Sequence, residues 1–101
     1  MLDHIFVYGT LRMGHSAHDL VDKIADYVGD VTSMPQFEMI ASDIPRLGGE
    51  EAIEGELYKL HPDASLDELD WYYGNDYERV QRWCVSEKVH AYLYIYVGGE
   101  L

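Results

Sequence analysis

The sequence predicts a single α+β domain, residues 1–101, built on a sheet with a few short helices. First, 101 residues suffice for one modest hydrophobic core but not for two. Second, 48% of the residues are hydrophobic, including nine tyrosines and two tryptophans, which excludes a disordered chain. Third, short runs of β-branched and aromatic residues outnumber the segments with helical spacing. We therefore expect one continuous core around a sheet.

The charge of the chain limits its partners. There are 19 acidic and 7 basic residues, which gives a formal net charge of −12. This charge opposes extended contact with nucleic acid or anionic lipid, so we expect neither partner. The one cysteine, Cys84, excludes an internal disulfide and is compatible with a reducing compartment. With no signal-peptide pattern and no spanning segment, the sequence is typical of a cytoplasmic protein.

A short strand followed by a glycine is the first functional candidate. Residues 5–8, Ile-Phe-Val-Tyr, have the composition of a buried strand, and Gly9 ends it. Because Gly9 has no Cβ, the chain can turn sharply or let a ligand approach the backbone there. The amides of Gly9, Thr10 and Leu11 would then form a small anion cradle. The same tripeptide also fits a plain turn at the end of a strand.

The middle of the chain mixes one helix with several strands. Helical spacing predicts a helix over residues 17–25, capped by Ser16, and period-two alternation predicts strands near 27–32, 37–41 and 52–60. The Pro and Gly content of residues 43–49 predicts a loop. Arg46 in this loop is of a type that can reach ligand carboxylates, although its default is a solvated surface position. Gly55 indicates a bulge or a close backbone approach. Two histidines and two aspartates between residues 15 and 22 form only a weak metal-ligand pattern, and we expect no metal or cofactor.

A second helix carries the candidate catalytic acid. Ser65 and Glu68 have the spacing of a capping box, which predicts a helix starting at Leu66. Asp70 lies nearly in line with the apolar face of this helix, so we expect a raised carboxyl pKa suited to general base chemistry. The alternative is that Asp70 is half-exposed or bonded near the helix end. Residues 78–97 then read as an antiparallel hairpin with one tyrosine-rich and one aliphatic face.

Several segments, in this order, resemble the gamma-glutamylcyclotransferase-like family, whose small members are called AIG2-like. The matching segments are VYGTLRMG at 7–14, IPRL at 44–47, IEGELYKL at 53–60, LDELD at 66–70 and YER at 77–79. The resemblance spans nearly the whole chain. It implies a small, strongly twisted mixed or barrel-like sheet flanked by two or so short helices, in agreement with the composition.

The resemblance also implies an activity and a site. Family members of this kind are acyltransferases that release 5-oxoproline and a free amine from a γ-glutamyl compound by intramolecular aminolysis, without a metal or cofactor. The implied substrate-binding residues are Tyr8, Gly9, Thr10, Leu11 and Tyr77.

The implied catalytic acid is Asp70, where the sequence departs twice from the family pattern. The family has Glu at the position of Asp70 and Gly at the position of Trp71. Shortening the acid by one methylene moves the carboxylate by about 1 Å, which can cost roughly 100-fold in rate. The alternative is therefore a non-catalytic module that binds a small molecule or a protein with the same fold. The sequence does not identify the amine that is attached to the glutamyl group. We expect the protein to be a monomer or a weak homodimer.

Overall fold

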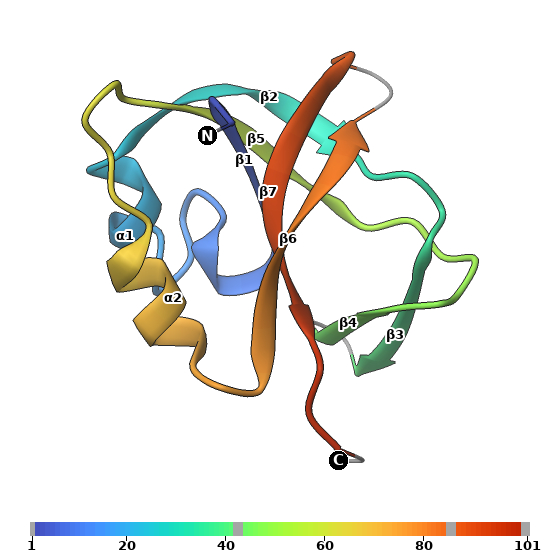
Figure 1. Ribbon diagram of the computed structural model, residues 1–101. Coiled ribbons are helices and arrows are strands. Elements are labelled where there is room, and N and C mark those ends of the chain that lie inside the picture. Colours follow the sequence, from blue (N-terminus) through green and yellow to red (C-terminus); the bar gives the residue numbers. More distant parts are fainter. Residues whose placement is uncertain (1, 42–43, 85–86, 100–101) are drawn as a thin grey trace.

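The computed structural model describes residues 2–41, 44–84 and 87–99. Within these ranges the chain forms seven strands, two short α-helices and one 3-10 turn (Figure 1). In chain order they are β1 (His4–Val7), η1 (Gly9–Leu11), α1 (Asp19–Asp22), β2 (Ala25–Thr32), β3 (Phe37–Ala41), β4 (Ile44–Leu47), β5 (Glu54–Leu60), α2 (Asp67–Tyr73), β6 (Tyr77–Cys84) and β7 (Val89–Tyr96).

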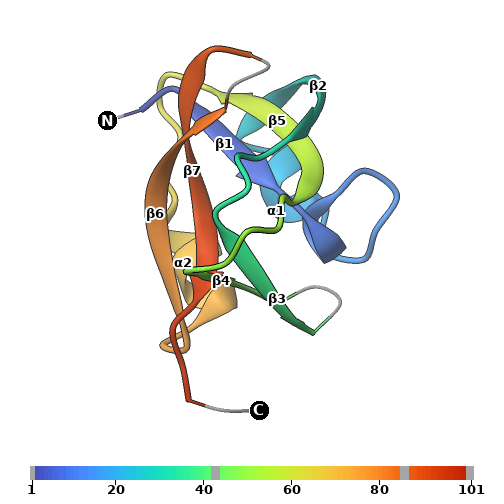
Figure 2. The same ribbon diagram turned by 90° about the vertical axis from the view of Figure 1, so that its right-hand side faces the viewer.

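Five of the strands form one mixed sheet, in the order β2-β5-β1-β7-β6. Strand β1 runs antiparallel to β5 and parallel to β7, and the remaining neighbours are antiparallel. Strands β3 and β4 form a separate two-stranded sheet. Helices α1 and α2 lie together on one side of the large sheet, and the β3–β4 pair lies on the other side, facing the viewer in Figure 2. The predicted α+β class is confirmed.

Both faces of the central strand β1 are buried. Ile5 and Val7 belong to the core cluster that includes Leu69 of α2, and Phe6 belongs to the cluster that includes Phe37 of β3. Side chains alternate between the faces of a strand, so a strand covered on both faces needs an unbroken apolar run. This is why the Ile-Phe-Val-Tyr run of residues 5–8 stands at the centre of the fold.

Strand β7 is covered on both faces in the same way, and the predicted hairpin is confirmed. Its tyrosines Tyr92 and Tyr94 face the helices, while Leu93 and Ile95 face the β3–β4 side. Strand β6 pairs with it in continuous register, from Tyr77 opposite Tyr96 to Cys84 opposite Val89. Cys84 is buried as packing material, and burial raises the pKa of its thiol.

Gly55 marks a close backbone approach, one of the two alternatives predicted for it. A Cβ built on Gly55 would lie 2.2 Å from the carbonyl oxygen of Val7, so no larger residue fits between β5 and β1. The register shift in this part of the sheet lies on β2 instead, between Tyr27 and Gly29.

The predicted loop over residues 43–49 is wrong for Ile44–Leu47, which form β4. Glu38 pairs with Arg46 and Met39 with Pro45 in an antiparallel register. Proline is tolerated because it stands on a two-stranded ribbon, where a strand needs partners on one side only. The Arg46 guanidinium donates a hydrogen bond to Glu38 at 3.2 Å, and both side chains are exposed, in agreement with the surface position that is its default. Asp43 of the predicted loop lies outside the described residues.

Both predicted helix starts are wrong in detail. The first α-helix is confined to Asp19–Asp22, because the amide of Ala17 is bonded at 2.9 Å to the carbonyl of Thr10, which ties the preceding turn to the glycine loop. The second begins at Asp67 rather than Leu66, with Leu66 as its N-cap. Glu68 does not close a capping box, since its carboxylate pairs with Lys23 at 2.5 Å, joining α2 to the end of α1.

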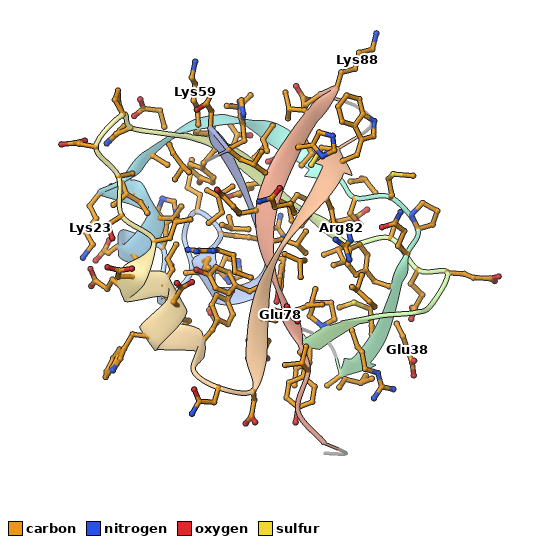
Figure 3. All side chains as sticks on the ribbon, in the orientation of Figure 1. Lys23, Glu38, Lys59, Glu78, Arg82 and Lys88 are labelled. Atoms are coloured by element: carbon orange, nitrogen blue, oxygen red, sulfur yellow. The ribbon has the colours of Figure 1, made fainter. Side chains whose placement is uncertain are left out.

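Charged side chains extend from the periphery of the fold. Among those labelled in Figure 3, Lys59 and Lys88 point away from the ribbon into solvent, whereas Lys23 and Glu38 lie at the surface in ion pairs with Glu68 and Arg46. This arrangement leaves the two clusters of apolar side chains enclosed between the layers.

Candidate functional site

The turn that follows β1 has a defined backbone conformation, and we call it the glycine loop. Gly9 has φ +59°, a left-handed backbone that favours glycine, and the chain then makes a single 3-10 turn over Gly9–Leu11. The side chain of Leu11 is buried and anchors the turn in the core. Its amide is bonded to the carbonyl of Tyr8 at 3.4 Å, so Leu11 is not part of an open cradle. In residues 2–41, 44–84 and 87–99, the backbone hydrogen bonds outside the regular elements do not use the Gly9 or Thr10 amide.

A hollow of about 370 Å³ adjoins this loop, and we call it the tyrosine hollow. Its lining residues come from four parts of the chain: Tyr8, Gly9, Thr10, Ile44, Tyr72, Tyr73 and Tyr77. The structure thus brings four of the five predicted substrate-binding residues together, all except Leu11. The tyrosines do not fill the hollow, although the hydroxyls of Thr10 and Tyr72 meet at 3.0 Å.

The tyrosine walls are held by ring contacts. Tyr73 stacks on Tyr94 with ring centroids 4.3 Å apart, and it contacts Tyr77 at 4.9 Å. Tyr8 donates its hydroxyl to the carbonyl of Tyr94 at 2.6 Å. The walls therefore link α2 to the ends of β1, β6 and β7, which fixes the shape of the hollow.

Asp70 lies in a different hollow, of about 630 Å³, whose lining includes Trp71, Tyr77 and Arg79 but not the glycine loop. One carboxylate oxygen accepts the hydroxyl of Tyr94 at 2.5 Å, and the other pairs with the guanidinium of Arg79 at 3.2 Å. The premise of an acid enclosed by apolar side chains is wrong, because 41% of the side chain is exposed.

The position of Tyr94 beside Asp70 makes its hydroxyl a weaker acid. Burial, and then the hydrogen bond to the Asp70 carboxylate, raise the pKa of the Tyr94 hydroxyl above its ordinary value of 10.0. The hydroxyl therefore remains a donor to Asp70 over the whole neutral range.

Tyr73, at the end of α2, lies closer to the glycine loop than Asp70 does, because it lines the hollow beside that loop. The helix ends at Gly74, its C-cap, with φ +75°, and the residue before this glycine is Tyr73. Of the acid-then-glycine pattern that the family resemblance implies for this helix, residues 73–74 therefore match the glycine, with tyrosine in place of the acid. In this register the side chain before the glycine borders the glycine loop, as Tyr73 does.

A second hollow next to the loop, of about 470 Å³, was missed by the sequence analysis, and we call it the Arg12 hollow. It is lined by Tyr8, Gly9, Arg12, His15, Thr32, Met39, Ala52, Ile53 and Glu54. Strand pairing brings Glu54 here, since β5 crosses between β1 and β2. No local signal in the sequence brings Glu54 near Gly9; only the position of Arg12, directly after the loop, could have pointed to this hollow.

Buried Glu56 lies behind the Arg12 hollow. Its Oε1 accepts the amide of Met13 at 2.8 Å and the hydroxyl of Tyr58 at 2.9 Å, and its Oε2 lies 3.9 Å from Nε of Arg12. Burial, and then the bond to Glu56, raise the pKa of the Tyr58 hydroxyl. Glu56 thus ties the end of the glycine loop to β5.

One histidine of the pattern at residues 15–22 supports the glycine loop. His18 is bonded through Nδ1 to the carbonyl of Leu11 at 3.0 Å, which supports the glycine loop from behind. The residues that the structure describes contain no group of three or more potential metal ligands. None of the helices in the described ranges is long and apolar enough to cross a membrane.

The family model described as gamma-glutamyl cyclotransferase, AIG2-like, matches residues 5–100. The chain belongs to this family. A curated protein of Methanocaldococcus jannaschii, named "Putative gamma-glutamylcyclotransferase", is 27% identical over 103 aligned residues, covering 94% of this chain and 85% of the relative. The resemblance that the sequence motifs indicated is confirmed.

Solved structures of similar shape confirm the cyclotransferase-like fold. A Pyrococcus horikoshii protein matches with a TM-score of 0.76 at 20% identity, covering 98% of this chain and 81% of that one. A mouse AIG2-like protein matches with a TM-score of 0.68 at 24% identity, covering 99% and 79%. At these identities the likeness concerns the fold of this family member, not its substrate.

Proposed function

We propose that the protein binds a γ-glutamyl compound at its glycine loop. The observation that carries this proposal is the tyrosine hollow itself, a space of about 370 Å³ that adjoins the amides of Gly9 and Thr10. Ligand sites of this size are mostly apolar or aromatic and orient the ligand with a few polar groups. Family membership supports the choice of a γ-glutamyl ligand.

Each part of the loop has a task in this proposal. The Gly9 and Thr10 amides donate hydrogen bonds to an anionic or carbonyl oxygen of the glutamyl group. The Thr10 hydroxyl, now bonded to Tyr72 at 3.0 Å, exchanges that partner for the ligand or helps to hold it. Tyr73 and Tyr77 pack against the aliphatic part of the glutamyl chain.

We further propose that the ligand is held rather than cyclised through Asp70. A general base must come within hydrogen-bond reach of the proton that it removes. Asp70 is engaged by Tyr94 and Arg79 in a hollow whose lining does not include the loop residues Tyr8 to Leu11. Tyr73, which borders the loop from the same helix, carries a phenol, and a phenol is a hydrogen-bond donor near neutral pH rather than a base.

Turnover is the second candidate, favoured by the family match and by the name of the M. jannaschii relative. In this reaction the α-amine of the glutamyl group attacks its own γ-carbonyl, forming the ring C–N bond. The bond to the leaving amine then breaks, and that amine gains a proton that the attacking amine lost. Asp70 would carry this proton, and the loop amides would stabilise the oxyanion. A shift of α2 that brings Asp70 to the loop is then required.

One experiment separates the two candidates. Purified protein is titrated calorimetrically with γ-glutamylalanine, glutathione and a γ-glutamyl amine, and the same mixtures are assayed for 5-oxoproline. Asp70→Asn is compared with Asp67→Asn, a matched control because Asp67 is an exposed carboxylate on the same helix. Holding without turnover predicts binding of at least one ligand, no 5-oxoproline, and the same affinity in both variants.

The outcomes are distinct. Release of 5-oxoproline that is lost in Asp70→Asn and kept in Asp67→Asn would establish the cyclotransferase reaction and its acid. Absence of both binding and release across the panel would contradict the proposal that the loop receives a γ-glutamyl group.

A further inference from the structure

Arg12 has an incomplete set of partners. Its Nε is buried and makes no hydrogen bond among the described residues, and Glu56 lies 3.9 Å away, beyond hydrogen-bond distance. Glu56 already accepts two donors on its other oxygen, from Met13 and Tyr58. A guanidinium has five N–H donors and 39% of this side chain is exposed, so Arg12 retains donors for a further acceptor.

These donors border a hollow large enough for a ligand. Arg12 lines the Arg12 hollow and also an adjoining hollow of about 400 Å³, and the two share Thr32 and Glu54. The Arg12 hollow and the tyrosine hollow both include Tyr8 and Gly9. A ligand that lies across Gly9 therefore has room on either side.

We propose that the Arg12 hollow receives the carboxylate of the amino-acid part of a γ-glutamyl amino acid, while its γ-glutamyl part lies in the tyrosine hollow. This rests on the proposed function and narrows it. Planar guanidinium groups match carboxylates in geometry, and the Glu56 carboxylate, 3.9 Å from Nε, leaves the other donors of Arg12 available. Glu54 lines the same hollow and repels a second carboxylate, so an amino acid with an acidic side chain fits poorly.

The test compares two ligands that differ in one carboxylate. γ-Glutamylalanine and γ-glutamylethylamide are titrated into wild type, Arg12→Gln and Arg46→Gln. Arg46 is the matched control, because 40% of its side chain is exposed, it pairs with Glu38, and neither residue is among those that line the two hollows. A charged hydrogen bond predicts that wild type and Arg46→Gln prefer γ-glutamylalanine by about 10–100-fold, and that Arg12→Gln loses this preference.

Failure of this inference and failure of the proposed function give different results. If wild type binds both ligands with equal affinity, Arg12 does not bind the carboxylate of the amino-acid part. The proposal that the tyrosine hollow receives the γ-glutamyl group then still stands. If neither ligand binds, the proposed function fails. The wild-type comparison needs no variant, so it stands even if circular dichroism shows Arg12→Gln to be unfolded. A preference kept in folded Arg12→Gln also overturns the inference.

Discussion

At the scale of single residues, two glycines of the sheet should differ in how much an added side chain destabilises the protein. A Cβ at Gly55 would lie 2.2 Å from the backbone oxygen of Val7, whereas one at Gly29 meets nothing within 4 Å. We expect Gly55→Ala to destabilise the protein by about 3 kcal/mol or more, because backbone cannot move aside cheaply. Gly29→Ala should change stability by less than about 1 kcal/mol. Urea denaturation of both variants measures this, and equal losses would contradict the packing of β5 on β1.

Buried tyrosines predict a loss of stability in alkali. Burial and carboxylate partners raise the pKa of Tyr58 and of Tyr94 above the ordinary 10.0. Below about pH 10 both residues are protonated in the folded and unfolded states. Above it the unfolded chain releases protons that the folded protein keeps, so stability falls as pH rises, by up to about 1.4 kcal/mol per pH unit for each tyrosine.

Tyr94→Phe should reduce this alkaline slope, because it removes one of the groups that titrates only on unfolding. Melting temperatures between about pH 9 and pH 11 measure the slope. Tyr72→Phe is the control, since Tyr72 is 43% exposed. A slope in Tyr94→Phe as steep as that of wild type would show that the Tyr94 hydroxyl is not held as described.

At the scale of elements, α2 presents one buried and one exposed face. Leu69 is 1% exposed, while Trp71, two residues on, is 84% exposed. We expect Leu69→Ala to cost about 2–5 kcal/mol, because it leaves a cavity against β1. Trp71→Ala should change the free energy of unfolding by about 0.5 kcal/mol or less. Denaturant titration of the two variants checks the orientation of the helix, and similar losses would contradict it.

Elements with a strong local pattern could be predicted, and those set by their neighbours could not. The Ile5–Tyr8 run and the alternation in residues 78–97 read directly as strands. Strand β4 was hidden because Pro45 and its neighbouring glycines signal a loop, and only its pairing with β3 makes it a strand. The predicted capping role of Glu68 failed for a similar reason, since Lys23 lies within reach only in the folded chain.

At the scale of the whole molecule, the candidate site depends on strand order. The motifs predicted the glycine loop and Tyr77, and the structure brings both to the tyrosine hollow. They did not predict that Asp70 borders a different hollow, or that Glu54 lies near Gly9. Both depend on the order β2-β5-β1-β7-β6, which joins segments distant in sequence and has no signature in any single motif.

The net charge of −12 predicts that salt stabilises the whole molecule. Screening weakens repulsion among the excess carboxylates, so raising ionic strength from about 0.01 M to about 1 M should stabilise the fold on the order of 1 kcal/mol. For a domain of this size, that gain corresponds to about 4–8 °C in Tm. Thermal melts in sodium chloride measure it. A Tm that falls with added salt would mean that attractive ion pairs outweigh the repulsion.

The most direct test of the central claim is an NMR titration of backbone amides with γ-glutamylalanine. If the glycine loop receives the γ-glutamyl group, the amide signals of Gly9 and Thr10 shift most, together with the ring signals of Tyr72, Tyr73 and Tyr77. Signals that move only around Asp70, with Gly9 and Thr10 unchanged at saturation, would contradict the account, as would a spectrum that does not change at all.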